Sequence, residues 1–499
     1  MEPKPKSADE LNDHLGHVSQ EHEIRIQKVK KLQNQGINPW PVVQTPTATA
    51  QQLLSSFVEN DNKIYELVGR VMTKRLHGKA AFVHMQDASG KIQIYLKEDV
   101  VGSDAFSFFE HSIDIGDILW VQGSMFKTQR GEISLRAAKL QLQSKCLHPL
   151  PEKFHGLHDV EVRYRQRYLD LICNEQSRQL LIKRSLIVQT IREFLTEKNY
   201  LEVETPMLHP IPGGAAAKPF KTHHNALGQD FYLRIAPELY LKRLVVGGLD
   251  RVFEINRNFR NEGISTKHNP EFSMLECYTA HHDLAYAMDL IEAIFQTVAK
   301  KIGVSTVQFG DYTIDFLKKF ERISLYDAVK KYHKLSNADF TDAKIDALLN
   351  IHKVSLPKLN MNLAEKIYLL FAETVEKELI APTFVTGFPV EVSPLAKRDA
   401  KNPDLASRAE LFVAGLELAN LFDELNDPFD QAARFTQQVQ AKNSGDVEAH
   451  EYDADYILAL EYGLPPTVGL GVGIDRMVML MTGTTSIKDV ILFPTLKKR

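Results

Sequence analysis

The chain has 499 residues, which is too long for one hydrophobic core and predicts two or three domains. Apolar residues make up 44% and charged residues 25%, as in an ordinary globular protein, and the net charge of −4 excludes binding of nucleic acid through bulk positive charge. The three cysteines, at positions 146, 173 and 277, are widely spaced, which excludes a disulfide framework and argues against a structural zinc site.

Residues 1–60 are predicted to form a polar tail and a helical extension. Residues 1–20 are predicted to be disordered, and they lack the apolar stretch of a signal peptide. No run of about 18 apolar residues follows, so no membrane partner is expected. The expected compartment is the cytoplasm, and DNA is not an expected partner.

A helix is predicted from Glu21 to Gln35, ended by Gly36 and Pro39. Its apolar side is predicted to carry Ile24, Val29 and Leu32. Its other side is predicted to carry most of the basic residues, namely Arg25, Lys28, Lys30 and Lys31. Taken alone, this is the pattern of a solvated amphipathic helix.

Residues 61–145 show short alternating runs that are typical of strands. The runs are YELVGRVMTKR, AAFVHMQDAS, GKIQIYLK, DILWVQGSMFKT and GEISLRAAKLQL. Turn residues separate them. Five strands in so short a stretch predict a small closed barrel, and the OB-fold is the commonest barrel of five strands.

Barrels of this kind bind single-stranded nucleic acid by stacking bases on aromatic side chains and bonding to base edges. Phe82 is the candidate for stacking, although its place in the pattern also fits the barrel core. Gln93 and Glu132 are the candidates for hydrogen bonds. Arg75 is the candidate for a backbone or base contact.

Residues 146–160, rich in proline and histidine, are predicted to be a linker, and residues 161–499 a second domain. Helical stretches segregated from strand runs predict an α+β fold with an antiparallel sheet flanked by helices. A helix from Leu180 to Lys198 precedes the strand YLEVE, which Pro206 ends. A mostly helical insertion is expected at about 302–380.

The segment Arg251–Tyr278 is predicted to be strand, loop and strand. The two-residue period of a strand puts four residues of the second arm on one face: Phe272, Met274, Glu276 and Tyr278. In the first arm one face carries Glu254, Asn256, Asn258 and Arg260, and Glu262 follows. Buried charges need partners. The segment therefore indicates a site for an anionic, planar ligand with an attached cation; an exposed hairpin is the alternative.

The run RAELFVAGLELANLF predicts a hairpin with a two-residue turn at Ala414-Gly415. Glu410 and Glu417 would share a face on a diagonal, roughly 7–8 Å apart. Two carboxylates so placed repel unless a cation bridges them, and their oxygens suit Mg²⁺ on phosphates. Two exposed glutamates on an edge hairpin are the alternative. The same parity puts Asn420 on the opposite face unless a bulge intervenes.

The run GLGVGIDRMVML resembles a dinucleotide-binding motif only in part, because Arg476 stands where a third glycine would be and no second strand can follow. It predicts a strand with one bare face, followed by a helix that starts near Asp475. Arg476 would lie in the first turn of that helix. A cation there is unfavourable unless an anion is bound.

These segments resemble the signatures of class II aminoacyl-tRNA synthetases, in the bacterial lysyl form of the class IIb subgroup. Similar segments run along nearly the whole chain, among them KFHGLHDVEVRYRQRYLDL, IPGGAAAKPF and YLRIAPELYLKRLVVGG. The resemblance implies a lysine–tRNA ligase that uses L-lysine, ATP and tRNA(Lys). It also implies Mg²⁺ as cofactor and a homodimer formed through the helix and strand before Pro206.

The resemblance assigns the nucleotide to six residues and the metal to two. Arg260 would contact the α-phosphate and Arg476 the γ-phosphate, and both would be catalytic. Glu262 and His268 would hold the adenine and the outer phosphates, with Phe272 stacked on the base. Glu410 would serve both ATP and metal, and Glu417 the metal.

The lysine and anticodon sites follow from the same resemblance. Gly214 would admit the α-amino end of lysine, and its two ammonium groups would meet Glu238, Glu276 and Glu424, with Tyr278 over the ε-ammonium. Asn420 is a further site position, and Leu421 replaces the glycine of many bacterial relatives. In the barrel, the pattern F-x-x-x-x-D-x-x-G-x-I-Q from Phe82 resembles the surface that faces the central anticodon uridine. The N-terminal helix would lie against tRNA.

Three alternatives stay open. An aspartyl or asparaginyl synthetase would share both domains but needs a cation for its substrate's side chain, where this chain offers Glu276 and Glu424. A catalytically inactive OB-fold tRNA-binding paralogue would not need the four site residues Arg260, Arg476, Glu410 and Glu417, which are all present in this chain. An enzyme that transfers lysine to a protein typically lacks the barrel at residues 61–145.

Overall fold

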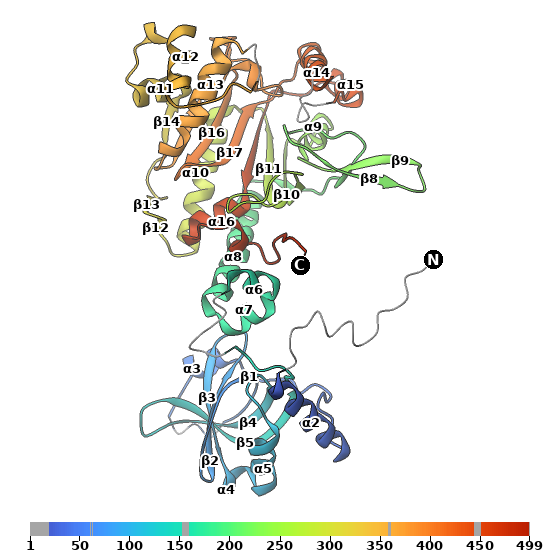
Figure 1. Ribbon diagram of the computed structural model, residues 1–499, viewed down its shortest axis with the longest axis vertical. Helices are drawn as coiled ribbons and strands as arrows, with labels where there is room; N and C mark the ends of the chain where they lie inside the picture. Colours follow the sequence, from blue (N-terminus) through green and yellow to red (C-terminus); the bar gives the residue numbers. More distant parts are fainter. Residues whose placement is uncertain are drawn as a thin grey trace. The chain divides into compact units, whose positions relative to one another are not determined.

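A computed structural model describes residues 19–59, 61, 63–151, 159–357, 361–443 and 451–498. The predicted tail up to residue 18 and residues 152–158 of the predicted linker lie outside the described residues. The chain divides into two compact units, Met1–His158 and Asp159–Arg499 (Figure 1). Within the described ranges, no helix is long and apolar enough to cross a membrane.

The N-terminal unit opens with α2 (Gln20–Asn34), whose first turn is capped by the side chain of Ser19. The predicted faces of this helix are wrong at two positions. Arg25, expected on the solvated side, is buried, whereas Ile24, expected on the apolar side, is 49% exposed. The cause is hydrogen bonding, because the Arg25 guanidinium donates to three backbone carbonyls, those of Ile115, Cys146 and His148. Arg25 therefore anchors the helix and is not free to contact phosphate.

Five strands of this unit close into a barrel in the order β1-β2-β3-β5-β4. They are β1 (Ile64–His77), β2 (Ala80–Gln86), β3 (Lys91–Lys97), β4 (Ile118–Lys127) and β5 (Ile133–Ser144). Short helices accompany them: α3 (Ala50–Ser55), α4 (Glu98–Val101) and α5 (Ser103–Ser112). Val83 and Ile94 point into the core and leave Phe82 on the outer face. The predicted five-stranded barrel is confirmed.

The second unit is built on an eight-stranded sheet in the order β14-β15-β16-β17-β18-β11-β10-β6 (Figure 1). Its strands are β6 (Leu201–Glu202), β10 (Arg251–Phe259), β11 (Glu271–Ala280), β14 (Glu321–Ser324), β15 (Thr383–Thr386), β16 (Arg408–Val413), β17 (Leu416–Asp423) and β18 (Thr467–Gly473). Only the two end pairs, β14–β15 and β10–β6, are parallel. The predicted α+β fold with an antiparallel sheet is confirmed.

One face of this sheet is buried under helices, namely α8 (Glu175–Glu197), α10 (Leu284–Lys301) and α16 (Ile474–Thr482). Ile191 of α8 and Phe295 of α10 pack against Leu275 of β11 and Leu470 of β18 in one apolar core. Because side chains alternate along a strand, residues 272, 274, 276 and 278 of β11 face the opposite side. That side carries the site described below.

The stretch at about 302–380 is not mostly helical as predicted. It holds α11 (Leu325–His333), α12 (Asp342–Ile351) and α13 (Leu363–Thr374), but also β12 (Thr306–Phe309), β13 (Tyr312–Asp315) and the edge strand β14. Each of these strands has only four residues. Val307 and Ile314 are buried in the main core, and this packing holds the short strands in place.

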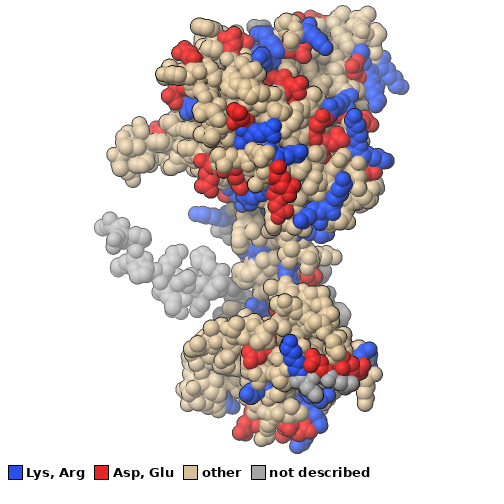
Figure 2. Space-filling view, turned by 180° about the vertical axis from the view of Figure 1, so that it is seen from behind, with Lys and Arg blue, Asp and Glu red and all other residues tan. Residues whose placement is uncertain are grey.

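The remaining elements frame the sheet. The helices are α6 (Val160–Arg165), α7 (Arg167–Cys173), α9 (Glu238–Val246), α14 (Pro428–Asn443), α15 (Ala454–Glu461) and α17 (Ile487–Val490). A small separate sheet contains β7 (Leu208–His209), β8 (Phe220–His224) and β9 (Gln229–Leu233). In Figure 2, acidic and basic side chains are interspersed over the visible face of this unit. Contacts with a nucleic acid would therefore depend on particular residues rather than on one broad basic surface.

Candidate active site

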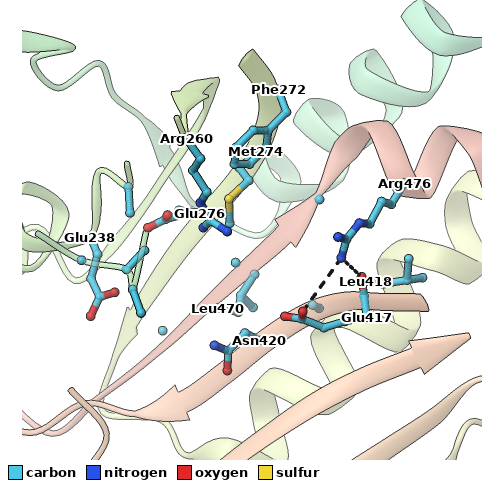
Figure 3. A pocket seen from close by; sticks show the side chains of 18 of the residues that line it. Glu238, Arg260, Phe272, Met274, Glu276, Glu417, Leu418, Asn420, Leu470 and Arg476 are labelled. Carbon is cyan, nitrogen blue, oxygen red and sulfur yellow. Dashed lines mark hydrogen bonds and ion pairs between the residues drawn. The ribbon is translucent and has the colours of Figure 1, made fainter. Parts of the chain in front are cut away.

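A cavity of about 430 Å³ lies on the polar face of the sheet, over strands β11, β18 and β17 (Figure 3). Its volume is within the range of small-molecule sites. Glu238 and Glu276 lie toward one end of the cavity in this view, and Arg476 and Glu417 toward the other. Glu238 and Glu276 thus lie apart from Arg476, which has Glu417 beside it, while Arg260 lies near Glu276.

Glycines of β18 make the floor of the cavity. Three of them lie opposite cavity residues of β11, as the pairs Gly469–Tyr278, Gly471–Glu276 and Gly473–Met274. A Cβ atom on Gly469 would lie 2.0 Å from Glu424 Oε1, and one on Gly471 would lie 2.8 Å from Met274 Cε. These positions therefore admit no side chain, because Glu424, Tyr278 and Met274 lie close against the bare face of the strand.

The polar face of β11 lines the cavity with Phe272, Met274, Glu276 and Tyr278. The hydroxyl of Tyr278 donates to Glu276 Oε2 at 3.0 Å. Burial and the nearby Glu238 raise the pKa of Glu276 to about 8. A cation bound beside Glu276 would favour its ionised form, so the site is suited to an ammonium group.

The polar face of β10 is used differently. Its residues pair across the strands with cavity residues of β11, as Glu254–Glu276, Asn256–Met274 and Asn258–Phe272. None of these three β10 residues lines the cavity. Glu254 accepts hydrogen bonds from Arg234 and from the Thr205 hydroxyl, each at 2.7 Å. Glu254 thus belongs to a structural network beside the site rather than to the cavity wall.

Arg260 lies where β10 gives way to the loop, and it lines the cavity. Its guanidinium lies 5.1 Å from the centre of the Phe272 ring. Its Nε is buried and, among the described residues, has no hydrogen-bond partner. Burial lowers the pKa of this guanidinium. A buried, unpartnered cation that faces a cavity is suited to an anionic ligand.

Arg476 lies in the first turn of α16, as predicted, at the mouth of the same cavity. Its Nη1 donates to the backbone oxygen of Glu417 at 2.6 Å, and its Nη2 lies 3.1 Å from His268 Nε2. Burial and Arg476 lower the pKa of His268. Glu262 and His268 are exposed on the loop that follows Arg260, and both line the cavity.

The hairpin β16–β17 has the predicted turn. Ala414 and Gly415 have φ angles of 51° and 68°, and Phe412 pairs with Glu417. The register then shifts, so that Glu410 pairs with Asn420. This β-bulge brings Asn420 onto the cavity face, which is the exception that the sequence analysis allowed for.

The predicted metal ligands are placed unequally. Glu417 lines the cavity, whereas Glu410 does not, and its carboxylate is paired with Arg408, which does. Burial and repulsion by neighbouring carboxylates raise the pKa of Glu410 to about 7 and that of Glu376 to about 8. Within the described residues, no three His, Cys, Asp or Glu side chains are grouped to hold a metal. Glu417 offers a carboxylate of the kind that Mg²⁺ prefers to the cavity, whereas Glu410 would have to exchange Arg408 for the metal.

The acidic region contains a lysine that the sequence analysis missed. Lys242 of α9 donates to Glu238 Oε1 at 2.7 Å and to Glu424 Oε2 at 2.8 Å. Glu238 lines the cavity beside Gly214, whose φ of 87° suits glycine, but Glu424 is buried behind Gly469 and does not. Two of the three expected acidic residues thus already share one protein cation.

Other polar residues were also missed. Arg408 donates to Asn420 Oδ1 at 3.0 Å. Asp475 accepts from Arg184 at 2.6 Å and from the backbone of Ser273 at 2.7 Å, which ties α8 and β11 to the start of α16. The position of Lys242, four residues after Glu238 on a helix, was a signal that could have identified that pair.

On the barrel, the predicted anticodon residues lie on neighbouring strands. Phe82 pairs with Arg75 on β1 and with Tyr95 on β3, and the two aromatic rings are 5.0 Å apart. Gln93 donates to Glu132 at 2.7 Å. Phe82 is half-buried on the outer surface of the barrel and is not part of its core.

Both units match known families. Residues 65–143 match the family of OB-fold nucleic acid binding domains. Residues 159–497 match the family of class II tRNA synthetases (D, K and N). The second match covers more than half of the chain.

Curated relatives match the chain along almost its whole length. A lysine–tRNA ligase of Carboxydothermus hydrogenoformans is 52% identical over 480 residues, which cover 95% of this chain and 98% of the relative. The heat-inducible lysine–tRNA ligase of Escherichia coli K12 is 49% identical, with 95% of each chain covered. A lysine–tRNA ligase of Legionella pneumophila is 49% identical, covering 96% of this chain and 98% of the relative. The chain therefore belongs to the class II tRNA synthetases of the D, K and N group, together with these lysine–tRNA ligases.

Proposed function

We propose that this chain is a lysine–tRNA ligase. It would join L-lysine to ATP as lysyl-adenylate and then transfer the lysyl group to the 3′ end of tRNA(Lys). The observation that carries the proposal is the acidic region of Glu238, Glu276 and Glu424. Lys242 offsets one of these three charges. The two that remain match the α- and ε-ammonium groups of lysine, each of which needs a carboxylate once it is dehydrated.

In the first step, a lysine carboxylate oxygen attacks the α-phosphorus of ATP while the bond to pyrophosphate breaks. Arg260 would hold the α-phosphate, since its guanidinium is buried without a hydrogen-bonded partner at Nε. Arg476 and His268 would bind the outer phosphates. Phe272 and Glu262 would hold the adenine. Arg260 would thus stabilise charge that grows on the five-coordinate phosphorus.

Mg²⁺, held by Glu410 and Glu417 with phosphate oxygens, would neutralise charge on the triphosphate when bound. In the protein without metal, the guanidinium of Arg408 neutralises the charge of Glu410. In the second step, a ribose hydroxyl at the tRNA 3′ end takes the lysyl group, and AMP leaves. None of the residues assigned here acts as a general base, so positioning and electrostatics would supply most of the catalysis.

We also propose that the enzyme is a homodimer and acts in the cytoplasm, where charged tRNA is used. Exposed apolar side chains occur on and next to α8 and β6, the elements implied for the dimer interface. They include Tyr168, Ile182, Leu201 and Leu208. A dimer interface over these elements would remove such side chains from water.

Amino-acid-dependent exchange of pyrophosphate into ATP tests the function. Lysine should stimulate exchange strongly, while aspartate and asparagine should not, because their side chains would leave a carboxylate of the pocket unpaired. Stimulation by aspartate alone would identify an aspartyl-type enzyme. Absence of exchange with every amino acid would favour an inactive tRNA-binding paralogue.

Replacement of Phe82 tests the anticodon surface. In Phe82→Ala the KM for tRNA(Lys) should rise about 10- to 100-fold, because one base–aromatic stack contributes roughly 1–3 kcal/mol. Pyrophosphate exchange, which needs no anticodon, should be unchanged. Tyr65→Ala is the control, since Tyr65 packs against the barrel core and pairs with β4 rather than β2. An unchanged KM in Phe82→Ala would remove this residue from the surface.

A further inference from the structure

Lys242 is a fully buried cation in the acidic region of the second unit. Its side chain is 0% exposed, and its ammonium group bonds to Glu238 and Glu424, which come from α9 and from the end of β17. The ring of Tyr456, from α15, lies 5.3 Å below it. Burial lowers the pKa of the Lys242 ammonium, but the two carboxylates outweigh this and raise it, so Lys242 is charged.

Lys242 donates a hydrogen bond to one oxygen of each carboxylate and leaves the other oxygen of each without a bond to it. Glu424 Oε1 is buried and has no hydrogen-bond partner among the described residues. It lies against bare Gly469, which is part of the cavity floor. Glu238 lines the cavity directly. A buried carboxylate oxygen without a partner is unfavourable unless a ligand supplies one, so the pair is incomplete in the free protein.

The charges around Lys242 can be counted. Glu238, Glu424 and Tyr456 contact it directly. The groups that act on these carboxylates from further off are Glu276, Tyr278 and Arg408. Burial raises the pKa of Glu276 and of Glu424 to about 8, and bound ammonium groups would favour the ionised form of both. With lysine bound, three carboxylates and one ammonium therefore give the acidic region a net charge of −2, with both tyrosines neutral. Arg408 is engaged by Glu410.

We propose that Lys242 determines amino-acid specificity. It holds one oxygen of Glu238 and one of Glu424, and it leaves the pocket two negative charges, which match the two ammonium groups of the substrate. This inference rests on the proposed function. Without Lys242, the two carboxylates would face each other unpaired and would share a proton. Lysine would then have to displace that proton in order to bind.

The alternative is an ion pair that only stabilises the fold. Both roles predict a loss of stability in Lys242→Met, so stability does not separate them. The number of protons released when lysine binds does, because it reports the charge state of the pocket. Calorimetry of lysine binding in buffers with different ionisation enthalpies measures this number without ATP or tRNA.

Near pH 7, K242M should release about one more proton per lysine than the unmodified enzyme. The matched control is K145M, because Lys145 is equally buried and also pairs with two carboxylates, those of Asp114 and Asp117, in the N-terminal unit. K145M should release the same number as the unmodified enzyme. Equal proton release in K242M and the unmodified enzyme would overturn the inference. Failure of the unmodified enzyme to bind lysine would instead refute the proposed function.

A double variant covers the case in which K242M does not fold. In K242M/E424Q one ammonium and one carboxylate are removed together, so the net charge of the acidic region stays the same although Glu238 loses its partner. This variant should fold, and its proton release should return to that of the unmodified enzyme, although it binds lysine more weakly. If neither variant folds, Lys242 belongs to the fold and the inference is overturned.

Discussion

Arg260→Met should lower the rate of lysyl-adenylate formation by about 10³-fold while lysine still binds. The guanidinium has no ion pair among the described residues, so its removal breaks no internal contact other than that with the Phe272 ring. A methionine keeps much of the packing on that ring. The loss should therefore fall on kcat for pyrophosphate exchange, because the guanidinium stabilises charge that grows only in the transition state.

The control for Arg260 is Arg257→Met on the same strand. Arg257 is 38% exposed and lies 3.7 Å from Glu271, a weak surface pair. The Arg257→Met variant should keep nearly full pyrophosphate-exchange activity. An equal loss in both variants would point to damage of β10. A raised KM for lysine with normal kcat in Arg260→Met would assign Arg260 to substrate binding instead.

The fold was predictable where period and turn chemistry agree. The five barrel strands and the two arms from Arg251 to Tyr278 follow the two-residue period, and the turn at Ala414-Gly415 set the pairing of Phe412 with Glu417. These are local signals. One buried face and one polar face are enough to fix which side of β11 lines a cavity.

The positions of Asn420 and Arg25 depend on interactions that no local pattern contains. Asn420 reaches the cavity face because of a bulge, which adds one residue without a sequence signature of its own. Arg25 is buried because its guanidinium donates hydrogen bonds to carbonyl oxygens of residues that lie 90 to 123 positions away in the sequence. In each case a contact distant in sequence outweighed the hydropathy of a single residue.

The site itself was predictable from its charged residues, but their partners were not. Glu238 and Glu424 were expected to meet the ammonium groups of a lysine substrate, and in the structure both are paired with Lys242. Likewise Glu410 was expected to need a positive charge, and Arg408 supplies one. Pairing depends on which side chains the fold brings within a few ångströms, and several of these lie on different elements.

Glu276→Gln should reduce kcat/KM for lysine by about 10²- to 10³-fold, because a buried ammonium would lose its charged partner. The pH dependence makes the prediction sharper. Since the pKa of Glu276 is raised to about 8, the free protein holds this carboxyl protonated below that pH, and lysine must displace the proton. In the unmodified enzyme the KM for lysine should therefore fall as pH rises toward about 8. The variant should lose this dependence, whereas titration of lysine's own α-amine affects both proteins equally.

Stability gives an independent readout of the same carboxyl. A folded pKa of about 8 against the ordinary value of 4.5 means that the unfolded chain releases the proton first as pH rises. The unliganded protein should thus lose stability from about pH 4.5 to about pH 8 through this group, and Glu276→Gln should be less sensitive in that window. Glu271→Gln, an exposed change on the same strand, should follow the unmodified protein. If Glu276→Gln shows the same pH profile as the unmodified protein in both KM and thermal unfolding, then Glu276 does not hold a lysine ammonium, and the electrostatic match on which lysine recognition rests is lost.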